Sequence, residues 1–261
     1  SSSRDGHFSI LDVHGDYDAF LVKYNAKGTA QWAVTFGGSG WDEFTSVEQT
    51  RDGGYIAAGF TQSADGDLAG LADGQSRDAV VVKFNAGGGV EWSRVFSGSQ
   101  ADQFVSVAVM RDGYAAACVT QSSDGDMAGM SSAKEDAVVV KYDLTGAQQW
   151  VRSLSGTGND RCTAVAVSGK ELLVAGYTAS TDLSFVDRES KGGYDGFVYR
   201  LDSHGDPLWY TSLGSSGWDR VTGICPVSGG FALSGYTDKA DGDLASLSAF
   251  GETEAFVARF D

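Results

Sequence analysis

The chain repeats itself with a period of about 59 residues, and this repeat limits the possible folds more than any other feature. The segment DAFLVKY at residues 18–24 recurs in closely similar form from Asp78, Asp136, Asp195 and Glu254. Three further series keep the same spacing of 58 to 60 residues: Trp32, Trp92, Trp150 and Trp209; Asp42, Asp102, Asp160 and Asp219; and Thr61, Thr120, Thr178 and Thr237. This agreement predicts one domain over residues 1–261. Its repeats span about 18–77, 78–135, 136–194 and 195–253, with a partial copy at 254–261.

Each repeat contains four segments with the two-residue apolar period of a short β-strand. In the first copy they predict strands at 19–25, 30–36, 43–50 and 55–61. The composition agrees, because 36 glycines and 27 aspartates against 8 glutamates favour tight turns over helices. No segment shows a convincing period of 3.6 residues, which indicates an all-β fold.

Four-stranded units repeated in series predict a β-propeller of four-stranded antiparallel blades, because stacked blades cover the faces that one blade leaves bare. We expect 43–50 as the innermost strand, followed outward by 55–61, 78–85 and 90–96. The connections of the 37–42 and 62–77 types then share one side of the molecule, here called the loop-rich face. The main rival is a β-helix, whose coils are far shorter than 59 residues.

We expect about four blades, and the number of strands does not decide whether they close into a ring. The ring could close by strand exchange between the two termini, or the chain could be an arc of a larger propeller. The 254–261 segment is a fifth copy of the third strand type, whereas the other types occur four times. This surplus strand could pair with the open edge of a neighbouring chain and cause self-association.

Several phrases of the first repeat carry a resemblance to a known family. They are the 18–24 segment, Trp32, GSGWD at 38–42 and DGGYIAAG at 52–59. These phrases resemble the bacterial β-propeller repeat family, often called the seven-bladed propeller repeat. The resemblance implies a secreted or bacterial cell-surface protein, and it carries no catalytic residues to transfer. The third repeat departs from the pattern, with Thr181-Asp182-Leu183 in place of the Asp-Gly-Asp phrase of the other long loops.

The Asp-Gly-Asp phrases of the long loops are candidate metal ligands. Carboxylates two residues apart in a glycine-containing loop can converge on a hard cation such as calcium. The alternative is a hydrogen-bonded turn without metal, and the ligand spacing does not fit an EF-hand. The candidate calcium ligands are Asp65, Asp67, Asp124, Asp126, Asp241 and Asp243. No other cofactor is expected.

Two tryptophans, Trp41 and Trp218, lie on the loop-rich face but are not part of the repeat, since Ala101 and Asn159 take the equivalent positions. Each could stack on a sugar or a peptide, or pack between neighbouring blades. The adjacent Asp42 and Asp219 are further candidate ligand contacts. As members of a series found in every repeat, they are also expected to accept backbone N–H bonds and stabilise the turn.

Charge and motif content narrow the function. A net charge of −16 argues against nucleic-acid binding, which needs clustered cations. No apolar run is long enough to insert into a membrane. The histidines, His7, His14 and His204, form no catalytic cluster. We therefore expect no enzyme but an extracellular or cell-surface binding or scaffold module that contacts a protein or glycan through the loop-rich face, which we expect to be acidic. The alternatives are a glycan-binding lectin and an enzyme with an acidic central channel lined by the repeated aspartates.

Overall fold

The computed structural model describes residues 14–261 except 16, 131–133 and 248–250, so His7 lies outside it. Within this part of the chain, seventeen strands form five antiparallel sheets. The first sheet has two strands, the next three have four each, and the last has three. The strands are β1 (Ala19–Tyr24), β2 (Ala30–Phe36), β3 (Asp42–Gln49), β4 (Tyr55–Thr61), β5 (Asp78–Phe84), β6 (Val90–Phe96), β7 (Asp102–Val109), β8 (Gly113–Thr120), β9 (Asp136–Asp143), β10 (Gln148–Ser153), β11 (Asp160–Ser168), β12 (Glu171–Thr178), β13 (Asp195–Leu201), β14 (Pro207–Leu213), β15 (Asp219–Val227), β16 (Gly230–Thr237) and β17 (Glu254–Phe260).

The all-β prediction and the order of strands within a repeat are confirmed. The sheet β3-β4-β5-β6 pairs the strands in the predicted order, and the next two sheets repeat it. Helical structure in the described residues is confined to four single 3-10 turns, one in each long loop: Gly66–Leu68, Gly125–Met127, Leu183–Phe185 and Gly242–Leu244. Among these residues, no helix is long and apolar enough to cross a membrane.

Neighbouring sheets pack face to face and share their hydrophobic cores. One core joins Ala115 and Val139 of the third sheet to Val174 and Phe197 of the fourth. Equivalent cores join the second sheet to the third and the fourth to the fifth. The first strands β3, β7, β11 and β15 contact one another in sequence along the molecule. Each sheet therefore covers the face that its neighbour would otherwise expose.

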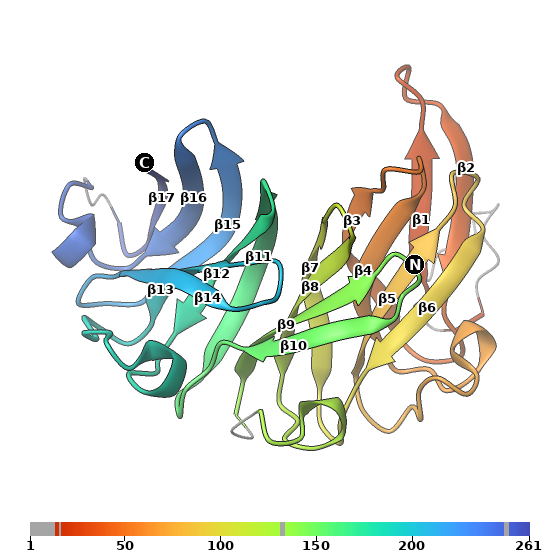
Figure 1. Cartoon of the computed structure of the whole chain (residues 1–261), viewed down its shortest axis with the longest axis horizontal. Coiled ribbons are helices and arrows are strands. Elements are labelled where there is room, and N and C mark those ends of the chain that lie inside the picture. Colours follow the sequence, from red (N-terminus) through yellow and green to blue (C-terminus); the bar gives the residue numbers. More distant parts are fainter. Residues whose placement is uncertain (1–13, 16, 131–133, 248–250) are drawn as a thin grey trace.

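The five sheets form an open arc, so of the two expected alternatives, the one in which the ring closes within this chain is wrong (Figure 1). The first and last sheets, β1-β2 and β15-β16-β17, remain separate. The N-terminal strands do not complete the last sheet, because β17 already occupies its third position. Strand β1 is also of the third type, so β1 and β2 could not complete that sheet without displacing β17.

Glycines with positive φ shape the short turns opposite the long loops. Gly53 in the β3–β4 turn has a φ of +83°, and Gly88 in the β5–β6 turn has a φ of +89°. Residues with a Cβ rarely adopt this conformation. These tight turns join adjacent paired strands at the ends opposite the long loops.

Candidate binding site on the loop-rich face

A buried aspartate begins the first strand of each of the second to fifth sheets and anchors the loop before it. Asp42 is only 3% exposed, and its Oδ1 accepts a hydrogen bond from Thr61 Oγ1 at 2.5 Å. Its Oδ2 accepts Gly38 N at 2.9 Å and Ser63 Oγ at 2.8 Å. The carboxylate thus joins the 37–41 loop to the start of the long loop.

The same arrangement recurs around Asp102 and Asp160, and Asp219 has a different set of donors. Asp102 accepts bonds from Thr120, Ser122 and Gly98 N. Asp160 accepts the equivalent bonds from Thr178, Ser180 and Gly156 N. Asp219 differs, because its donors are the backbone N–H and the Oγ of Ser215. Both carboxylates are fully buried. This confirms that the repeated aspartate accepts backbone N–H bonds. Asp42 and Asp219 thus lie beneath the loops that present Trp41 and Trp218, where their oxygens already have donors.

The six candidate calcium ligands are also engaged with the loop of the 37–42 type. Asp65 Oδ1 accepts Ser39 N at 2.7 Å, and Asp67 Oδ2 accepts Gly37 N at 3.1 Å. Equivalent bonds from the 97–99 and 214–216 loops reach Asp124, Asp126, Asp241 and Asp243. The backbone bond from Ser39 lowers the pKa of Asp65, and the side-chain bond from Ser216 lowers that of Asp241.

The two alternatives for these loops were a calcium site and a hydrogen-bonded turn without metal. The contacts support the hydrogen-bonded turn. Among the described residues, no group of three or more His, Cys, Asp or Glu side chains is placed to hold a metal ion. Calcium binding stays a prediction. The divergent third loop keeps the same anchor, because Asp182 Oδ1 accepts Thr157 N at 2.8 Å.

Trp218 lies at the edge of a cluster of aromatic side chains and is 52% exposed. Its ring centroid is 5.3 Å from that of Tyr194, and Tyr194 is 5.3 Å from Tyr177, both in edge-to-face contact. The guanidinium of Arg220 lies over these rings, 4.6 Å from the Tyr177 centroid and 5.6 Å from that of Trp218. Such contacts restrain the indole and leave about half of its surface free.

Trp41 occupies an equivalent place at the other end of the arc and is 42% exposed. It contacts Tyr17 at 5.7 Å and Phe60 at 5.5 Å between ring centroids. The Arg77 guanidinium lies 4.1 Å from the Phe60 centroid and 5.4 Å from that of Trp41. A cavity of about 330 Å³ lies beside it, with Tyr17 and Trp41 in its wall.

The tyrosines and arginines of these clusters were not among the residues singled out from the sequence. One signal was available, because Tyr17 and Tyr194 each stand one residue before the repeated aspartates Asp18 and Asp195. Among the equivalent positions, tyrosine occurs only ahead of the two loops that carry tryptophan. The arginine contacts join side chains from different strands, and only the folded chain brings them together.

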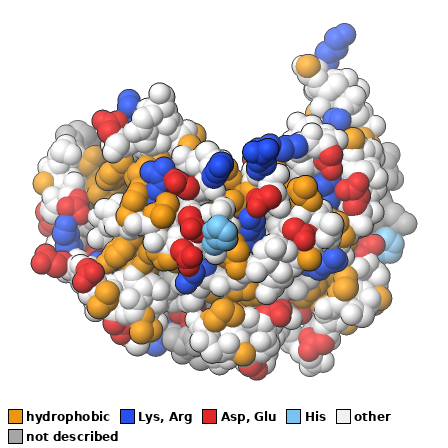
Figure 2. All heavy atoms as spheres, in the orientation of Figure 1, with side chains coloured by type: hydrophobic (Ala, Val, Ile, Leu, Met, Phe, Trp, Pro, Cys, Tyr) orange, Lys and Arg blue, Asp and Glu red, His pale blue; other side chains and the backbone are white. Residues whose placement is uncertain are grey.

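Charge over the visible face is mixed. Figure 2 shows Asp and Glu side chains dispersed among hydrophobic and uncharged groups, while Lys and Arg side chains gather at the notch between the two arms of the arc. The aspartates considered for an acidic channel, Asp42, Asp102, Asp160 and Asp219, are each buried within their own loop network.

The buried aspartates should make the stability of the folded protein depend on pH. Burial raises the pKa of Asp78 to about 6 and also raises those of Asp102, Asp160 and Asp195. At these four carboxyl groups the folded state therefore binds protons more tightly than the unfolded chain. The stability linked to Asp78 is fully present below its ordinary pKa of 3.8 and is lost as the pH rises through about 6. We expect the free energy of unfolding, measured by chemical denaturation, to be about 1–2 kcal/mol higher near pH 5 than near pH 7.5.

The variant Asp78→Asn is the control for this prediction. It should flatten the change between these two pH values, because the neutral amide does not titrate. A wild-type protein that loses stability on going from pH 7.5 to pH 5 would contradict the prediction.

Comparison with known proteins finds distant similarities. No family model matches the chain. The chain is 27% identical over 258 residues to the regulatory protein FlaEY of Caulobacter vibrioides, a match that covers 89% of this chain and 27% of FlaEY. The chain thus spans about a quarter of the length of that curated protein.

Two solved structures are weakly similar. A protein of unknown function from Bacteroides caccae matches with a TM-score of 0.34 and 12% identity, covering 72% of this chain and 73% of that one. The cobalt-substituted ACO of Synechocystis matches with a TM-score of 0.31 and 9% identity, covering 94% of this chain and 62% of that one. Both TM-scores are too low to support an argument about function.

Proposed function

We propose that this chain is a non-catalytic binding module, secreted or held at a bacterial cell surface, that contacts a protein or glycan through its loop-rich face. The observation that carries the proposal is the pair of exposed indoles, Trp41 and Trp218, on restrained clusters of rings and arginine. A large aromatic side chain that is restrained before binding loses little conformational entropy when a ligand covers it.

The same proposal includes the finer architecture. The sheets are blades of a β-propeller of the bacterial repeat family, and the chain is an arc of a larger ring. The contacts among the successive first strands and the cores shared by neighbouring sheets support this assignment. A central acidic active site receives less support, because the buried aspartates are used to anchor loops.

Replacing both exposed tryptophans tests the proposal. In the double variant Trp41→Ala/Trp218→Ala, binding to a glycan array or to the native bacterial surface should fall at least tenfold, because the stacking area is lost. The matched control is Tyr24→Ala, which removes a ring that is 59% exposed at the end of β1, next to the short β1–β2 turn and away from the loop-rich face. The control should bind as the wild type does.

The melting temperatures of both variants show whether each remains folded. Equal binding by the double variant and the wild type would contradict a role for the tryptophans. If the folded wild-type protein bound neither the array nor the surface, the proposed function would be wrong.

A further inference from the structure

Arg220 is held among aromatic rings without an acidic partner in the part of the chain that the structure describes. Its Nη1 donates to Tyr236 Oη at 3.1 Å, and Tyr236 is the one hydrogen-bond acceptor that these residues provide. Its Nε is buried and has no partner among them. A guanidinium offers five N–H donors in a planar fork that suits a carboxylate, so most of this capacity is unused.

At the preceding junction between sheets, a carboxylate of the chain itself fills the equivalent place. Arg161 is the equivalent of Arg220, since each follows the repeated aspartate of its repeat. Arg161 Nη1 forms an ion pair with Glu135 Oε1 at 3.2 Å. The residue equivalent to Glu135 is Tyr194, which presents a ring to the guanidinium 5.4 Å from its centroid. The junction at Arg161 thus contains a carboxylate of the chain itself, whereas among the described residues the junction at Arg220 has a tyrosine in that place.

The junction that lacks a carboxylate for Arg220 among the described residues also carries the exposed Trp218. Trp218 takes the place of Asn159 in the loop, and its ring borders the Arg220 guanidinium. The indole lies close against Gly193, where an added Cβ would come within 2.5 Å of Trp218 Nε1. Asp238 Oδ1 accepts the backbone N–H of Trp218 at 2.7 Å and stabilises the loop from its other side. An open aromatic surface and an arginine with unused donors therefore lie side by side.

We propose that Trp218 and Arg220 form a subsite for the carboxylate of an acidic saccharide. The ligand carboxylate takes the role at Arg220 that Glu135 takes at Arg161, and the apolar face of its sugar ring lies on the Trp218 indole. The inference rests on the proposed function and specifies its ligand class. A saccharide fits better than an acidic peptide, because a flat, half-exposed indole next to a planar fork matches a rigid ring bearing one carboxylate.

Paired ligands provide the test. An array carries oligosaccharides with uronic acid and others with sialic acid, each also printed as its neutral methyl ester, together with a glutamate-rich peptide. We expect the wild-type protein to bind at least one acidic form and to bind the ester at least tenfold more weakly. Isothermal titration with the same ligand in solution gives the ratio of the two dissociation constants.

Variants then assign the effect to the subsite. Arg220→Gln should weaken binding of the acidic form at least tenfold and leave the weak binding of the ester unchanged. Trp218→Ala should weaken both forms. The matched control Arg161→Gln removes an equivalent arginine that already has Glu135, and its binding should equal that of the wild type. The melting temperature of each variant shows that it is folded.

Each alternative outcome overturns the inference. Equal affinity for acid and ester, or no effect of Arg220→Gln, would refute the carboxylate subsite and leave the proposed binding face intact if Trp218→Ala still weakened binding. Binding of the glutamate-rich peptide alone, with dependence on Arg220, would assign the subsite to an acidic peptide. The absence of any signal on the array and on the native surface would refute the proposed function as well.

Discussion

Replacing Asp160 by alanine is expected to lower the free energy of unfolding by about 3 kcal/mol. Asp160 is fully buried and accepts hydrogen bonds from Thr178 Oγ1, from Ser180 Oγ at 2.8 Å and from Gly156 N at 2.7 Å. The variant leaves all three donors in the interior without an acceptor. Chemical denaturation near pH 7.5 measures the loss.

Two further variants make this prediction specific. Asp160→Asn keeps one acceptor oxygen and should lose less stability than the alanine variant. Asp143→Ala serves as the control, because Asp143 also accepts backbone N–H bonds, from Thr145 and Ala147, but in an exposed turn. Its loss should be a small fraction of that at Asp160. An equal loss at the two sites would show that the buried anchor has no special role.

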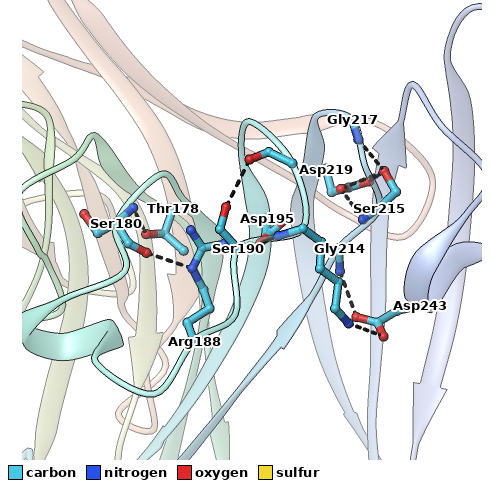
Figure 3. Close-up of polar contacts among 12 residues, drawn as sticks. Thr178, Ser180, Arg188, Ser190, Asp195, Gly214, Ser215, Gly217, Asp219 and Asp243 are labelled. Atoms are coloured by element: carbon cyan, nitrogen blue, oxygen red, sulfur yellow. Dashed lines mark hydrogen bonds and ion pairs between the residues drawn. The ribbon is translucent and has the colours of Figure 1, made fainter.

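Replacing Arg188 by methionine is expected to lower the free energy of unfolding by about 3–5 kcal/mol. Arg188 lies in the divergent third long loop, where it forms an ion pair with Asp195 and donates Nε to Ser180 O at 2.7 Å (Figure 3). Both side chains are almost completely buried. Without the guanidinium, the Asp195 carboxylate would remain in the interior with Lys191 N as its donor.

A second substitution should reverse part of this loss. In Arg188→Met/Asp195→Asn, no uncompensated charge is buried, so the double variant should recover at least half of the stability lost by the single variant. Burial already raises the pKa of Asp195, and removal of the cation should raise it further. Chemical denaturation should then show that the single variant gains more stability than the wild type between about pH 7.5 and pH 5. A double variant no more stable than the single one would contradict a role for the ion pair.

Much of the local structure was predictable because each repeat carries its own signals. The first repeat was expected to contain strands at 19–25, 30–36, 43–50 and 55–61, and the observed bounds differ by at most one residue. Alternation of apolar residues and the glycine turns between strands are short-range features. They act within a few residues, so the sequence is sufficient to locate them.

The candidate site was predictable only in part. Trp41 and Trp218 were identified because they break the repeat, and both are exposed on loops that the repeated aspartate anchors. Their companions were not identified, because the contact between Trp218 and Arg220 depends on how two strands and their loops pack. The ion pair of Arg188 was equally inaccessible, since nothing in the third loop indicates that a charged side chain turns inward.

The sequence alone determined the repeat, the all-β class, the strand order within a sheet and the aspartate that begins each first strand, because all of these follow from local pattern and its recurrence. Only the tertiary structure decided that the five sheets form an open arc and that the rings of Tyr177, Tyr194, Trp218 and Tyr236 surround Arg220. The open arc depends on which sheet faces pack together and on β17, which already occupies the third position of the last sheet. The surroundings of Arg220 depend on Tyr194, which stands where the preceding junction has Glu135. Contacts between residues far apart in the chain set both conditions, and the pattern within a single repeat does not encode them.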